Sequence, residues 1–177
     1  MIESEAKLLA LIVQHDDRDA FAALVRRYQS PVRNFLRKLT NGDVERSNDL
    51  AQETFIKLYR ALASYRGEAR FSTWLYQIAY HAFLNDKRGQ KDQEELDESL
   101  HSKDRDPADI ASDEADVARA LRLLNQEQRA IFDLHYQKGM SHQEVATTMN
   151  IPLGTVKSEL LRGLEKLREQ LSQKEIA

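Results

Sequence analysis

The sequence predicts an all-α fold of two small helical domains joined by an acidic flexible linker. Apolar residues recur at helical spacing along most of the chain, and only six glycines and three prolines occur among 177 residues. Charge is unevenly spread: residues 89–116 hold eleven acidic and three basic residues, a net charge of −8, whereas the remainder carries +5. We therefore expect domains at 1–90 and 116–177, with the linker at 91–115.

The N-terminal domain is expected to contain four helices. A short helix should precede Asp16, and residues 21–39 form one amphipathic pattern in which Pro31 predicts a kink or a break. Residues 50–62 predict the next helix. A last helix should begin near Ser72, and its apolar stripe predicts core positions for two aromatic residues, Phe71 and Trp74.

The C-terminal domain should begin where helical periodicity resumes, at Val117 and Leu121. A helix is predicted over residues 127–138. It should end at Gly139, because a residue without a Cβ adopts positive φ without a steric clash. This domain is therefore expected to be helical from its first residues.

A tight helical pair is predicted after Gly139. Ser141 and Glu144 have the spacing of a capping box, which marks the start of a short helix. Pro152 is suited to the first turn of the following helix, predicted over residues 153–171. Five apolar residues of that helix are expected to face inward: Val156, Leu160, Leu164, Leu167 and Leu171.

A short helix, a turn and a longer helix together indicate a helix-turn-helix. In that motif the start of the second helix faces a DNA major groove, where hydroxyl groups and cations are suitable contacts. Spacing alone leaves a plain helical hairpin with a solvated charged face equally open. The outward residues are Thr155, Lys157, Ser158, Glu159 and Arg162.

Composition argues against several classes of protein. Cysteine is absent, which excludes disulfides, thiol catalysis and sulfur-based zinc sites. The five histidines form no ligand cluster, and no nucleophile–base set or cofactor motif occurs, so we expect no metal, no cofactor and no catalysis. The acidic start of the chain does not resemble a secretory signal, and no apolar run approaches the ~20 residues of a membrane span. We expect a cytoplasmic protein.

Three segments resemble motifs of one family. Residues 151–158 look like the promoter-recognition helix of the extracytoplasmic-function group of bacterial sigma factors, a group within the sigma-70 family. Residues 49–59 are similar to the helix by which that group binds the polymerase clamp, and residues 65–79 to its segment for melting and recognising the −10 element. The three motifs occur in the family's order and cover nearly the whole chain.

The resemblance implies an alternative sigma factor that gives promoter specificity to core RNA polymerase. The N-terminal domain would bind the polymerase clamp and the −10 element, and the C-terminal domain the −35 element and the polymerase flap. The partners implied are therefore core polymerase, promoter DNA and an anti-sigma factor that blocks both surfaces. The clamp contacts implied are Asp49, Gln52, Glu53 and Lys57.

The same resemblance directs attention to polar and aromatic residues of the −10 segment. His81 lies where relatives often carry asparagine and bind a flipped base; a histidine ring does not offer the side-by-side donor and acceptor of an amide, so the preferred base should differ. Aromatic rings stack on bases of single-stranded DNA, and cations bind its phosphates. The −10 candidates are Tyr65, Arg66, Tyr76, His81, Asn85, Lys87 and Arg88.

In the −35 segment the resemblance makes Lys157 and Arg162 contacts to phosphates or bases, with Thr155 and Ser158 able to reach either. Glu159 departs from the family, which tends to carry arginine there. Its carboxylate could accept a hydrogen bond from a cytosine amino group, or it could pair with Arg162, three residues further along the same helix.

The main rival is a helix-turn-helix activator that binds duplex DNA without being a polymerase subunit. Such a protein should lack an aromatic segment for strand melting. A second rival is a helical interaction protein that only docks on other proteins.

Overall fold

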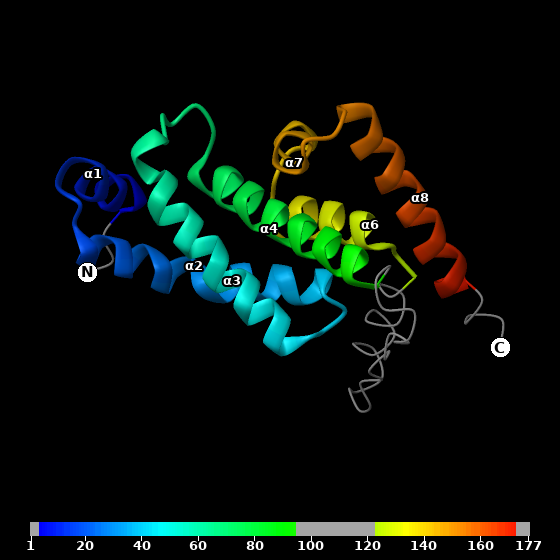
Figure 1. The fold of residues 1–177 in the computed structure, drawn as a ribbon. Helices are drawn as coiled ribbons and strands as arrows, with labels where there is room; N and C mark the ends of the chain where they lie inside the picture. Colours follow the sequence, from blue (N-terminus) through cyan, green and yellow to red (C-terminus); the bar gives the residue numbers. More distant parts are fainter. Residues whose placement is uncertain (1–3, 95–122, 173–177) are drawn as a thin grey trace. The chain divides into compact units, whose positions relative to one another are not determined.

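The computed structural model describes residues 4–94 and 123–172 and divides the chain into two units, Met1–Glu98 and Ser99–Ala177. The described residues form helices, with no strand among them (Figure 1). Most of the predicted linker, together with Val117 and Leu121, lies outside the described residues. No helix within the described ranges has the length and apolar character that a membrane crossing requires.

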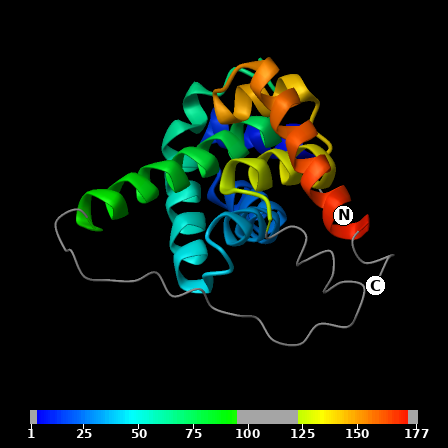
Figure 2. The same cartoon turned by 90° about the vertical axis from the view of Figure 1, so that its right-hand side faces the viewer.

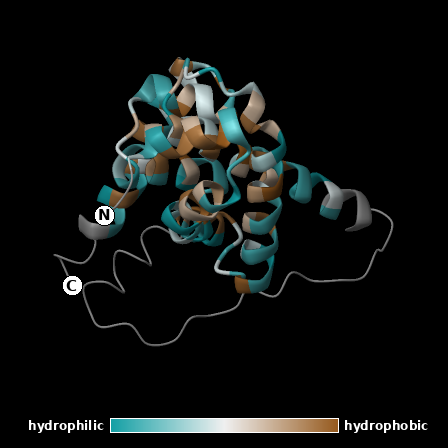
Figure 3. Ribbon diagram, turned by 90° about the vertical axis from the view of Figure 1, so that its left-hand side faces the viewer, coloured by the Kyte–Doolittle hydropathy of each residue, from teal (hydrophilic) through white to brown (hydrophobic). Residues whose placement is uncertain are grey.

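The first unit is a helical bundle in which α2 packs against α1, α3 and α4, and α3 packs against α4. Each helix has hydrophilic and hydrophobic residues side by side (Figure 3), and the fully buried apolar side chains include Leu24, Phe35 and Leu58. Asp17 and Asp43 cap the starts of α2 and α3 by accepting backbone N–H groups. The elements are α1 (Glu5–His15), α2 (Arg18–Leu39), α3 (Val44–Ala61), a 3₁₀ turn η1 (Leu62–Ser64) and α4 (Phe71–Glu94).

Of the kink or break predicted at Pro31, the break does not occur, since α2 runs through it to Leu39. A proline inside a helix costs about 3 kcal/mol because it removes one backbone hydrogen bond and crowds the preceding turn. Just beyond it, Val32, Phe35 and Leu36 are fully buried. Burial of each such side chain contributes about 1.5–3 kcal/mol, so packing of the second half of α2 outweighs the cost of the proline.

Helix α4 extends further than the sequence pattern indicates. It begins at Phe71, one residue before the predicted start, and continues to Glu94, four residues past the domain end predicted at residue 90. Figure 2 shows its C-terminal turns projecting beyond the other helices of the first unit. Helical periodicity of apolar residues fails as a signal there because a projecting helix end has no partner to pack against.

The second unit is a helix-turn-helix preceded by one helix. The confirmed features include the capping box, in which Ser141 Oγ accepts the Glu144 N–H at 3.2 Å and the Glu144 carboxylate accepts the Ser141 N–H at 2.9 Å. Gly139 has φ of +65°, as its predicted role at a helix end requires. The elements are α6 (Gln126–Phe132), a π-helical turn η2 (Asp133–Gln137), α7 (His142–Met149) and α8 (Leu153–Ser172).

The buried stripe of α8 is narrower than predicted. Val156 and Leu160 are buried, but Leu164 is 40% exposed, which corrects its predicted inward position. The helix buries Gly163 in its place. There the Phe132 ring of α6 approaches so closely that a Cβ on Gly163 would lie 2.5 Å from its Cε2 atom. A leucine at 164 is rotated about 100° from Gly163 and cannot share that contact.

Candidate nucleic-acid and polymerase interfaces

One face of α4 carries a partly exposed row of polar and aromatic side chains. Trp74, His81, Asn85 and Arg88 recur at intervals of seven, four and three residues, which places them on one side of the helix. Trp74 and His81 are half-buried, whereas Asn85 and Arg88 are exposed. The row therefore presents an indole, an imidazole, an amide and a guanidinium in succession along about four helical turns.

Tyr65 lies at the start of this row, in the loop before α4. Its ring stacks on Trp74, with centroids 5.0 Å apart and planes at 28°, and meets Phe71 edge-on at 5.8 Å. Its hydroxyl donates to the Ala69 carbonyl at 2.7 Å, and burial raises the pKa of the phenol, so the group remains a donor. Phe71 is a core residue as predicted, at 2% exposure. Trp74 was also predicted to lie in the core, but it is only half-buried and extends the aromatic surface.

Two predicted −10 residues do not join this row. Tyr76 is only 3% exposed and packs edge-on against Phe35 at 5.3 Å, so its ring belongs to the core and we withdraw it as a DNA contact. Lys87 is exposed but lies on a different side of α4, about 120° from His81. Arg66 is exposed in the loop that follows Tyr65.

The hollow beside Tyr65 is open to solvent and has a volume of about 690 Å³. It lies between α1 and the loop 65–70, with Glu5, Leu9, Tyr65 and Phe71 among its lining residues. Glu5 accepts a hydrogen bond from Tyr28, which fixes the carboxylate at this edge of the bundle. The loop therefore borders an open hollow next to the aromatic stack.

Helix α3 presents the four predicted clamp residues in two groups. Asp49 and Gln52 are exposed at its centre, in line with Ile56, an apolar residue that is 45% exposed and that the sequence interpretation did not single out. Glu53 and Lys57 lie at the edge of this face and pair with each other at 2.5 Å. The exposed side of α3 therefore presents a carboxylate, an amide and an aliphatic side chain in succession.

The first turns of α8 carry the predicted −35 residues. Lys157 is exposed, Thr155 and Ser158 are half-buried, and the Ser158 hydroxyl donates to the Thr155 carbonyl at 3.0 Å. Arg162 is exposed, with 65% of its side chain accessible. Between Lys157 and Arg162 lies Leu161, 63% exposed, which the sequence interpretation did not single out.

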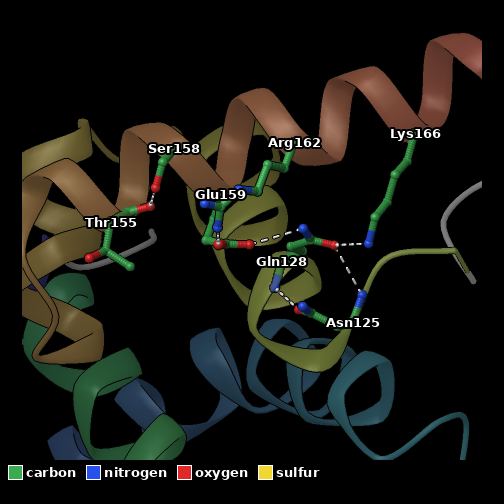
Figure 4. A network of polar contacts seen from close by, with 7 residues as sticks. All are labelled: Asn125, Gln128, Thr155, Ser158, Glu159, Arg162 and Lys166. Atoms are coloured by element: carbon green, nitrogen blue, oxygen red, sulfur yellow. Dashed lines mark hydrogen bonds and ion pairs between the residues drawn. The ribbon is translucent and has the colours of Figure 1, made fainter.

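Glu159 differs from its neighbours because its side chain is only 12% exposed. One carboxylate oxygen accepts from Gln128 Nε2 of α6 at 2.9 Å, and the other from Arg162 Nη1 at 2.5 Å (Figure 4). Of the two roles left open by the sequence, the free protein adopts the pairing with Arg162. The carboxylate is turned toward α6, so a direct contact with a cytosine is not supported.

Comparison with known proteins gives matches in both units. Residues 24–93 match Sigma-70 region 2, and residues 114–167 match Sigma-70, region 4. The RNA polymerase sigma-H factor of Pseudomonas aeruginosa is 33% identical over 174 residues, which cover 90% of each chain. The ECF RNA polymerase sigma-E factor of Haemophilus influenzae is 31% identical over 175 residues, which cover 90% of this chain and 91% of that protein.

The fold is also found among solved structures. The sigma factor RpoE from Bartonella quintana, in co-crystals with the anti-sigma factor NepR, has a TM-score of 0.72 at 24% identity, covering 86% of this chain and 96% of that chain. Region 2 coincides with the unit that carries the α4 row, and region 4 with the unit that carries the helix-turn-helix. The chain therefore belongs to the sigma-70 family of RNA polymerase sigma factors, in its extracytoplasmic-function group.

Proposed function

We propose that this chain is an alternative sigma factor that joins core RNA polymerase in the cytoplasm and directs initiation at promoters by recognising their −10 and −35 elements. The observation that supports this most strongly is the order of the two regions, each with an exposed face of nucleic-acid-binding chemistry. The proposed domain limits are 1–90 and 116–177 with a linker at 91–115; the matched regions pass these limits by three residues at 93 and by two residues at 114, and α4 by four residues at Glu94.

The α4 row suits single-stranded DNA. Stacking of a base on an aromatic ring contributes about 1–3 kcal/mol, and bases become available for stacking only after the strands separate. The Tyr65–Trp74 stack would hold the upstream end of the melted −10 element. His81 and Asn85 would hydrogen-bond to base edges, while Arg66, Arg88 and Lys87 would bind phosphates.

The start of α8 suits duplex DNA. In a helix-turn-helix the N-terminal residues of the second helix lie in the major groove. Thr155, Lys157 and Ser158 would position the helix on the backbone and Arg162 would reach a base edge. Glu159 would act through Arg162 rather than on the DNA.

The contact with polymerase would use α3. The exposed line of Asp49, Gln52 and Ile56, flanked by the Glu53–Lys57 pair, would bind the clamp, and the region 4 unit would bind the flap. An anti-sigma factor would hold the protein inactive by covering these faces. The sigma factor RpoE from Bartonella quintana, which has the same fold, was crystallised in complex with the anti-sigma factor NepR.

The proposal is tested by transcription in vitro. Purified chain with core polymerase should start transcripts at defined positions on a genomic promoter library, whereas the chain alone should bind the same fragments weakly. Strong sequence-specific duplex binding in the absence of polymerase, with no effect on transcript start sites, would instead favour the activator. An activator of that kind should lack an aromatic segment for strand melting, whereas this chain has the Tyr65–Trp74 stack.

A further inference from the structure

Glu159 lies in the middle of the candidate −35 surface, yet its carboxylate is anchored to the body of the domain. Its Oε2 atom accepts from Gln128 Nε2 at 2.9 Å and its Oε1 atom accepts from Arg162 Nη1 at 2.5 Å (Figure 4). The anchored carboxylate is 12% exposed and the arginine it holds is 65% exposed. An acid covered by the protein thus restrains a cation that faces solvent.

The anchor itself is fixed by its own hydrogen bonds. Gln128 is 2% exposed, and its Oε1 atom accepts from the Asn125 N–H at 3.2 Å and from Lys166 Nζ at 3.1 Å. Because the amide oxygen faces these two donors, its NH₂ group must face Glu159. If the carboxylate swung away, a buried N–H would lose its acceptor, which is unfavourable. The position of the Glu159 carboxylate is therefore fixed by α6 and does not depend on Arg162.

An arginine held in one orientation and a freely moving arginine differ in how well they bind guanine and phosphate. A guanidinium has five N–H donors in one plane, so the bond to Glu159 leaves donors for DNA. Recognition of guanine requires two of them in a fixed direction, whereas phosphate contacts tolerate many directions. The carboxylate also opposes the approach of phosphate.

We propose that Glu159 is a positioning residue that holds Arg162 in one orientation for a base edge of the −35 element and weakens its non-specific phosphate contacts. The inference rests on the proposed function. Glu159 and Arg162 would together determine which base is preferred at one base pair of the −35 element.

The test uses holoenzyme containing the full chain with Glu159→Gln. A glutamine at this position can still accept from Gln128 but cannot form an ion pair with Arg162, so the fold is retained. A bidentate arginine–guanine contact discriminates roughly 5- to 150-fold between bases, and ordering a long side chain accounts for roughly 2- to 12-fold in binding. We therefore expect E159Q to reduce discrimination between bases roughly 2- to 12-fold at one −35 position. The measurement is run-off transcription from templates that carry each of the four bases at each −35 position.

Binding to non-specific duplex should change in the opposite direction, becoming a few-fold tighter at low salt because a negative charge is removed. A merely structural defect would weaken both kinds of binding. The matched control is Glu165→Gln, an exposed position of the same helix, which removes the same charge. It should tighten non-specific binding without any change in discrimination. In an Arg162→Ala background, E159Q should no longer affect discrimination.

Glu159→Asp provides a second arm, since it keeps the charge but shortens the reach to Arg162. It should lower discrimination without tightening non-specific binding. Wild-type discrimination in both E159Q and E159D, alongside a loss in R162A, would overturn the inference while leaving the proposed function intact. Failure of the wild-type holoenzyme to initiate at defined promoters would refute the proposed function itself.

Discussion

Replacement of Gly163 by alanine tests how closely α8 packs against α6. An added Cβ would lie 2.5 Å from Phe132 Cε2, 2.9 Å from Phe132 Cζ and 3.3 Å from Leu124 Cδ2. Carbon atoms in contact are normally separated by about 3.5–4.0 Å, so the ring or the helix must shift by roughly 1 Å. Such overpacking costs about 1–3 kcal/mol.

Helix propensity acts in the opposite direction, because alanine inside a helix is favoured over glycine by up to about 1 kcal/mol. We therefore expect G163A to lower the free energy of unfolding of the second unit by roughly 0–2 kcal/mol. The matched control is Gly154→Ala in the same helix, where nothing lies within 4 Å of the added Cβ. It should be neutral or slightly stabilising, and the difference between the two variants approximates the steric cost.

Urea unfolding measures both values. Far-UV circular dichroism reports both units, whereas fluorescence of the single tryptophan, Trp74, reports the first unit alone. The fluorescence transition should be unchanged in G163A, while the circular dichroism transition should begin at lower urea. Equal or greater stability of G163A relative to G154A would refute the close approach of α8 to Phe132.

Three further predictions concern other parts of the molecule. Ser141→Ala removes the side-chain acceptor of the α7 capping box and should lower the stability of the second unit by about 0.5–2 kcal/mol in the same urea experiment. Tyr65→Ala removes one ring of the aromatic stack and should reduce permanganate reactivity of melted −10 thymines roughly tenfold, with recovery on a premelted template. Asp49→Ala combined with Gln52→Ala should weaken binding to core polymerase by about tenfold, measured by competition against the wild-type chain, with unchanged circular dichroism.

Much of the fold could be predicted because its signals are local. Ser141, Glu144 and Gly139 mark helix ends by hydrogen bonds and backbone angles that depend only on near neighbours. The errors in predicted burial arise where contacts with residues distant in the sequence determine which side chains are covered. Gly163 is buried because Phe132 approaches it, and no periodicity of α8 alone distinguishes it from the neighbouring Leu164.

The candidate site follows the same division. The outward positions of Lys157 and Arg162 could be placed from spacing, because a helix beginning near Pro152 fixes them, whereas Glu159, also predicted to face outward, is only 12% exposed. Tyr76 and Trp74 were misassigned because both are aromatic residues near one end of α4, and only contact with Phe35 or Tyr65 separates core from surface. The anchoring of Glu159 by Gln128, 31 positions earlier, could not be predicted from the recognition helix alone.

Gln128 has a consequence for which substitutions the domain can accept. Its side chain completes the capping box of α6 and at the same time donates to Glu159. Glutamate serves a capping box as well as glutamine does, but it has no N–H to donate and would place a second negative charge beside Glu159. Evolution or design could therefore exchange Gln128 for glutamate only after residue 159 had become neutral or basic. A position that looks interchangeable within its own helix is in this way tied to the charge of a residue on α8, and under our proposal to the base that Arg162 contacts.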